Sequence, residues 1–81
     1  MKNKDLVKLW ISQTKSSGKG NNMYFRDNMI FSYGNHFMIA KIDGNRVEFN
    51  NRKYSSSTSR HQFYVKNAII NSDFDIDYID W

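Results

Sequence analysis

Two histidines and several nearby hydroxyl residues are the side chains in this 81-residue sequence that could perform catalysis. A serine activated by the imidazole of His36 or His61 would be a nucleophile of the hydrolase type. However, the sequence has no nucleophile elbow, and no carboxylate stands at a spacing that would orient either ring. A metal site would need a third ligand, and neither a His-Glu-x-x-His pattern nor a cysteine supplies one. We therefore predict structural histidines and a non-catalytic protein without metal or cofactor, and keep a His-dependent enzyme as a third hypothesis.

The acidic residues near the end of the chain suggest a binding function. The segment DFDIDYIDW at 73–81 alternates acidic and apolar residues through Tyr78, which predicts a half-buried strand. Its carboxylates would stand about 6.6 Å apart, a spacing comparable to that of neighbouring phosphates on a nucleic-acid strand. The strand could therefore imitate a nucleic-acid backbone, or it could be an edge strand whose charges prevent aggregation. The candidate partner-binding residues are Glu48, Asp73, Asp75, Asp77, Tyr78, Asp80 and Trp81.

The charges divide unevenly along the chain. The net charge is +4, but four of the eight acidic residues lie in 73–81, so residues 1–72 carry twelve cations against four anions. This asymmetry favours an electrostatically steered partner, although a basic surface that simply faces water would give the same pattern. Nucleic acid is the alternative partner, because basic residues interleave with aromatic ones, as in binders of single strands. The candidate nucleic-acid-binding residues are Lys41, Arg46, Arg52, Lys53, Arg60 and Lys66.

Apolar periodicity predicts the elements that position these residues. Residues 4–14 have a helical apolar stripe that includes Trp10, and the polar, Gly-containing segment 15–22 is predicted to be a mobile connection. Residues 23–50 are predicted to form an antiparallel meander of about four strands, with a type I′ turn at Asp43-Gly44, a turn or bulge at Gly34-Asn35 and a further turn at Asp27-Asn28.

A second helix is predicted over residues 57–71. Ser59 and Gln62 match the capping-box pattern that marks a helix start. His61, Val65 and Ile69 recur at helical spacing, so this face of the helix is expected to lie on the sheet.

The predicted fold is a single α+β domain: a helix, the meander, a helix on one face of the sheet, and an additional edge strand at the end of the chain. A chain of this length has a small core, and its thirteen aromatic residues compensate for this. The sequence contains no cysteine and no apolar run of membrane-spanning length, so we expect a cytoplasmic protein that does not enter a membrane. An exposed sheet edge would permit a homodimer, and the sequence leaves that question open.

Several motifs resemble a small domain that recurs in phage and other viral genomes. They are Ser-Tyr-Gly-Asn-His-Phe at 32–37 and Thr-x-x-His-Gln at 58–62, and the similarity covers about residues 23–70. More narrowly, the chain resembles early proteins of staphylococcal phages that inhibit the DNA sliding clamp of the host. The resemblance implies a host-takeover protein that acts in the host cytoplasm without catalysis, by entering the DNA channel of the clamp. A basic channel would attract the acidic strand, whereas the basic body would have to face away.

Overall fold

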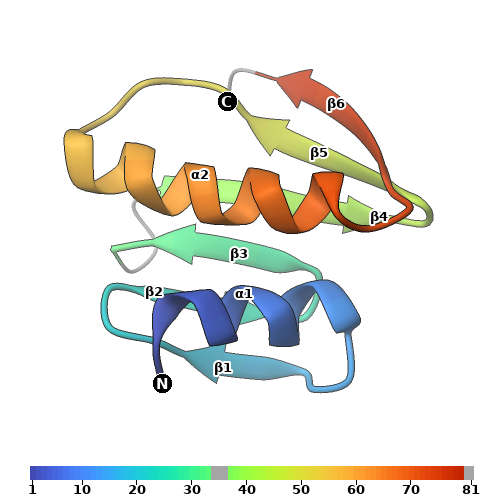
Figure 1. Cartoon of the computed structure of the whole chain (residues 1–81), viewed down its shortest axis with the longest axis horizontal. Coiled ribbons are helices and arrows are strands. Elements are labelled where there is room, and N and C mark those ends of the chain that lie inside the picture. The colour runs from blue at the N-terminus through green and yellow to red at the C-terminus, as the bar shows by residue number, and fades with distance from the viewer. Residues whose placement is uncertain (34–36, 80–81) are drawn as a thin grey trace.

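The computed structural model describes residues 1–33 and 37–79, in which two helices pack on one face of a six-stranded sheet (Figure 1). The spatial order of the strands follows the chain, and all neighbouring strands are antiparallel except β5 and β6. This confirms the predicted α+β class and the central meander. The elements are α1 (Asn3–Ser12), β1 (Ser17–Lys19), β2 (Met23–Arg26), β3 (Met29–Ser32), β4 (Phe37–Asp43), β5 (Arg46–Asn50), α2 (Ser56–Ile70) and β6 (Asp75–Ile79).

Two of the predicted turns join strands of the meander. Asp27 and Asn28 connect β2 to β3, and Gly44 and Asn45 connect β4 to β5. Gly44 has a φ of 64°, whereas Asn45 is not among the described residues with positive φ. Positive φ at the first central residue alone fits a type II′ turn, so the prediction of a type I′ turn was wrong. The predicted turn or bulge at Gly34-Asn35 lies outside the described residues.

The segment predicted to be a mobile connection contains the first strand, β1. Gly18 leaves no room for a larger residue, because a Cβ there would lie 2.6 Å from the ring of Phe25 and 3.0 Å from the side chain of Leu6. The backbone N–H of Asn21 donates to the side-chain carbonyl of Asn3, which ties the end of this segment to α1. The strand β1 has only three residues and no apolar alternation, so the hydrophobic pattern of the sequence could not predict it.

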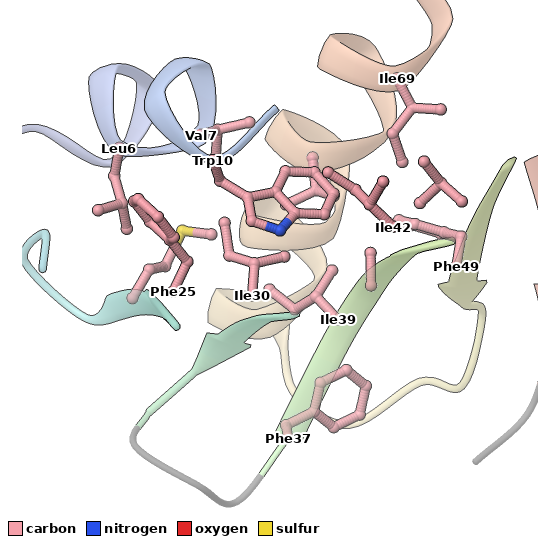
Figure 2. Packing of buried hydrophobic residues seen from close by; sticks show 14 residues of the cluster. Leu6, Val7, Trp10, Phe25, Ile30, Phe37, Ile39, Ile42, Phe49 and Ile69 are labelled. Atoms are coloured by element: carbon pink, nitrogen blue, oxygen red, sulfur yellow. The ribbon is translucent and has the colours of Figure 1, made fainter. Parts of the chain in front are cut away.

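The core lies between the sheet and the two helices. Leu6, Val7 and Trp10 of α1 are essentially inaccessible to solvent, as the predicted apolar stripe requires. Figure 2 shows the indole of Trp10 directed from α1 toward Ile30 and Ile39 of the sheet. Its Nε1 donates to the backbone carbonyl of Asn28 at 3.0 Å, so the only polar atom of the ring is satisfied.

The second helix begins earlier than the predicted capping box. Ser55 is the N-cap, and its hydroxyl accepts a hydrogen bond from the backbone N–H of Thr58 at 3.1 Å. Ser59 lies inside the helix. The side chain of Gln62 donates to the carbonyls of Asn50 and Arg52, so it fixes the incoming loop and does not cap the helix. In a run of several serines, each is an equally plausible cap by type, and the contact with Thr58 selects Ser55.

The position of the N-cap at Ser55 predicts different effects for two similar substitutions. Ser55→Ala is expected to lower the free energy of unfolding by about 1 kcal/mol, because it removes the N-cap acceptor. Ser59→Ala is expected to change it by less than about 0.5 kcal/mol, because the side chain is exposed within the helix. Urea denaturation followed by circular dichroism measures both values. A larger loss of stability in Ser59→Ala than in Ser55→Ala would show that Ser59 caps the helix, as the sequence predicted.

The last strand joins the sheet in parallel orientation. After α2 crosses the sheet, β6 pairs with β5 in a register that places Asp75 beside Arg46 and Asp77 beside Glu48. Ile76 packs against the core and the predicted strand is confirmed over residues 75–79, but its burial does not alternate strictly, because Asp77 is half-buried and Tyr78 is 52% exposed. Because β6 pairs on one side only within the described sheet, it is also an edge strand, as expected.

Candidate functional site

The face of the sheet opposite the helices carries a cluster of charged residues at its β4–β6 end. Val47 and Phe49 are buried in the core, so the alternate residues of β5, Arg46 and Glu48, lie on the opposite face. The register of β6 then brings Asp75 and Asp77 to the same face. The structure thus places together three of the acidic residues predicted to bind a partner.

Cross-strand pairing arranges these charges in two rows. In one row, Lys41 of β4 lies beside Glu48 of β5, which lies beside Asp77 of β6. In the other row, the β4 neighbour of Arg46 is Asp43 and its β6 neighbour is Asp75. We call this set the acidic patch; it contains four carboxylates and two cations: Asp43, Glu48, Asp75, Asp77, Lys41 and Arg46.

Asp43 was missed as a member of the acidic patch by the sequence analysis. It was interpreted only as a turn residue, because its position beside Arg46 depends on strand pairing. The turn interpretation and the patch position are compatible, since Asp43 is the last residue of β4 and is exposed. Its side chain adds a fourth carboxylate to the patch.

One cation in the patch is engaged by a carboxylate. Arg46 contacts Asp77 through two atoms, Nε to Oδ2 at 3.1 Å and Nη2 to Oδ1 at 3.2 Å. Both side chains are about half exposed, at 56% and 42%, so solvent screens this pair and it contributes at most about 1 kcal/mol to stability. Its larger effect is on the surface potential, since Arg46 neutralises part of the charge of the strand.

The remaining predicted partner-binding residues are placed differently. Asp73 is exposed in the turn before β6 and is therefore adjacent to the patch. Tyr78 lies on the helix side of the strand, where its ring meets Phe49 edge-on at 5.9 Å and lies 5.3 Å from the ammonium of Lys66. Tyr78 therefore cannot join the acidic patch. Asp80 and Trp81 lie outside the described residues.

The six cations of the nucleic-acid alternative do not form one surface. Lys41 and Arg46 belong to the acidic patch on the open face of the sheet. Arg60 and Lys66 lie on α2, which covers the other face, and Arg52 and Lys53 lie in the loop before α2. A single nucleic-acid strand following one face would contact only part of this set.

His61 forms a buried polar network with the hydroxyl of Ser32. Its Nδ1 lies 2.7 Å from the hydroxyl of Ser32, and its Nε2 lies 3.5 Å from the amide nitrogen of Asn3. If Asn3 donates to Nε2, then Nδ1 carries the proton and donates to Ser32. Thr58 completes the network at 3.3 Å from the Ser32 hydroxyl.

This arrangement joins α1, β3 and α2 through one buried imidazole. With the proton on Nδ1, the imidazole donates to Ser32 and does not take its proton, and Ser32 is inaccessible to solvent. The structural role predicted for His61 thus involves a serine of the buried strand β3. His36, the other histidine considered there, lies outside the described residues.

The environment of His61 predicts a pH dependence of stability. Burial, together with the neighbouring charge of Arg60, lowers the pKa of His61 below its usual 6.5. The folded protein therefore favours neutral His61, and this contribution to stability is present above the unfolded pKa and is lost as pH falls through the folded pKa. We expect the free energy of unfolding to fall between about pH 7.5 and about pH 5.5, above the carboxylate range.

Urea denaturation across this pH range tests the expectation. In His61→Asn, the part of the slope due to this imidazole disappears, and the variant as a whole is less stable because the Ser32 contact is lost. An identical slope in the two proteins would show that His61 does not contribute.

Comparisons with known proteins do not extend these observations. No protein-family model, curated protein or solved structure matches this chain. Among the described histidine and acidic side chains, no group of three is close enough to hold a metal ion. Across residues 1–33 and 37–79, neither helix is long and apolar enough to cross a membrane.

Proposed function

We propose that this protein is a non-catalytic inhibitor that binds a basic, DNA-handling host protein through the acidic patch. The observation that carries the proposal is the placement of Glu48, Asp75 and Asp77 on one face of adjacent paired strands. A strand spaces alternate carboxylates about 6.6 Å apart, and the neighbouring strand adds a second row about 4.8 Å away. Such a rigid array presents negative charge in the way that a nucleic-acid backbone does.

The chain's charge distribution is consistent with this proposal. The acidic patch lies on the open face of the sheet, whereas the cations of α1 and α2 lie on the other side of the molecule. A basic partner would therefore meet the acidic patch first and be repelled by the opposite side. The resemblance to phage proteins suggests the DNA sliding clamp as the specific partner and the host cytoplasm as the place of action.

Direct binding to a purified bacterial sliding clamp tests this function. We expect a nuclease-treated sample of the protein to bind the clamp, with an affinity that falls steeply as salt rises, because exposed charges steer the association. A short DNA duplex should compete for the same channel. Binding that is insensitive to duplex DNA would contradict mimicry, and no binding to the clamp would remove that partner.

Truncation of the chain is a less suitable test than substitution. Deleting residues 73–81 would remove the strand that pairs with β5 and the contacts of Ile76 with the core, so lost binding could simply reflect lost folding. Substitutions of exposed charges in the acidic patch leave these contacts in place.

Nucleic acid remains the second candidate, supported by two features of the described sheet: Lys41 on β4, opposite Met29, and the stacked rings of Tyr24 and Phe31, whose centroids are 4.9 Å apart. Binding of a labelled single-stranded oligonucleotide by the protein, together with no binding to the clamp, would favour this second candidate.

A further inference from the structure

The outer surface of the two helices has a charge opposite to that of the acidic patch. Helices α1 and α2 lie side by side and run in the same direction over the sheet (Figure 1). Together they contain four cations and one acidic residue, Asp5. This surface is therefore basic. The four cations are Lys4, Lys8, Arg60 and Lys66.

A groove of about 290 Å³ runs between the two helices. Its floor is apolar, with Val7 and Ile11 from α1 and Ala68 from α2. Lys4 and Lys8 stand one turn apart on the α1 wall, and the ammonium of Lys4 lies 5.5 Å from the centre of the Tyr64 ring on α2, while Asn67 and Asn71 stand one turn apart on the other wall. The groove thus combines an apolar base with a cationic rim and an amide rim.

Exposed apolar side chains continue this surface along α2. Phe63 and Ile70 are each 60% exposed and lie seven residues apart, or about 10 Å along the helix axis. Asn67 stands between them on the same side of the helix. A bound helix in helix-in-groove recognition presents apolar residues from i to i+7, so its apolar face is about as long as the Phe63–Ile70 interval.

We propose that the groove and the two exposed apolar residues bind an acidic amphipathic helix of a partner protein. Apolar residues of that helix would enter the groove and cover Phe63 and Ile70, and its acidic residues would meet Lys4 and Lys8. Both the apolar and the charged parts of the surface are then matched by one ligand.

Two other ligands fit this surface less well. A nucleic acid supplies phosphates for the lysines but no aliphatic side chains for the floor of the groove. An anionic membrane is flat and would need apolar residues on the outer side of both helices, whereas the outer residues of α1 include exposed Asp5, Lys8 and Ser12. The proposal is independent of the acidic patch, because it concerns the opposite side of the molecule.

A designed peptide tests the proposal. The probe is a fluorescein-labelled helix of about four turns with leucine at positions i, i+3, i+4 and i+7 and glutamate elsewhere, titrated with the full-length protein by fluorescence anisotropy. We expect micromolar binding. A scrambled peptide of the same composition, which has no apolar face, should bind at least about tenfold more weakly.

Variants on both kinds of contact separate this site from nonspecific attraction. The double variant Phe63→Ser/Ile70→Ser and the single variant Lys8→Glu should each weaken binding about tenfold or more. Phe63→Leu should retain binding, and Lys19→Glu on β1 is a matched charge control that should leave it unchanged. Circular dichroism and thermal unfolding verify that each variant is folded, as the exposure of these side chains leads us to expect.

Three results would overturn the proposal: no detectable binding of the designed peptide, equal binding of the scrambled peptide, or equal affinity of the Phe63→Ser/Ile70→Ser variant. Binding of a single-stranded oligonucleotide or of vesicles with anionic lipid, lost in the same variants while the peptide fails to bind, would assign the surface to those ligands instead.

Discussion

Trp10→Ala is expected to lower the free energy of unfolding by about 3–5 kcal/mol, which is the largest effect of any substitution considered for this protein. The side chain is inaccessible to solvent, so its removal leaves a cavity between α1 and the sheet. It also removes one of the two hydrogen bonds that the carbonyl of Asn28 accepts, leaving the one from the backbone N–H of Ile42. A domain of this length has a total stability of only about 4–12 kcal/mol, so the variant would be partly or wholly unfolded at ordinary temperature.

Urea denaturation monitored by circular dichroism measures this effect. Phe63→Ala is a matched control, because it also truncates an aromatic residue on a helix but one that is 60% exposed, and it should cost less than about 1 kcal/mol. If Trp10→Ala lost less than 1 kcal/mol, the position of α1 on the sheet would be wrong.

The second large effect concerns binding and has opposite signs at neighbouring positions of the acidic patch. Asp75→Lys should weaken binding to a basic partner by about ten- to a hundredfold, because it replaces attraction by repulsion within the array. Arg46→Gln should strengthen the same binding by about three- to tenfold, because it releases Asp77 from its ion pair and removes a repelled cation. Affinity measured at low salt with the purified clamp reports both changes.

These variants also distinguish the two candidate functions. If the open face binds nucleic acid, the signs reverse: Arg46→Gln weakens retention of an oligonucleotide, and Asp75→Lys strengthens it. Asp5→Lys makes the same charge change on α1, away from β6, and should not alter binding to the clamp. An equal loss in Asp5→Lys and Asp75→Lys would indicate that only net charge matters, contrary to the proposed patch.

The sequence was sufficient for those elements whose apolar pattern is local. The stripe around Trp10, the meander over residues 23–50 and the buried face of α2 were predicted because each depends on periodicity within one segment. The strand β1 was missed because Ser17–Lys19 has no apolar alternation, and its place in the sheet follows from its pairing with β2. The start of α2 was misplaced because several hydroxyls compete for one cap.

The candidate site depended on pairing between distant segments, which the sequence could not provide. The acidic and apolar faces of β6 followed from alternation, but its parallel orientation determines that Asp77 meets Arg46 and that Asp75 completes a row with Asp43. The link between His61 and Ser32 likewise crosses from α2 to β3. Candidate residues of the right type were therefore identified, but their partners were not.

The parallel attachment of β6 also has a consequence for the order of folding. Strands β1 to β5 each pair with the strand next to them in the chain, and such short loops close at low entropic cost. The β5–β6 pair encloses the whole of α2, so its closure spans the longest interval of any strand pair described here. Loop-closure entropy therefore predicts that the meander pairs before β6 docks on β5, so that the paired rows of carboxylates form late in folding.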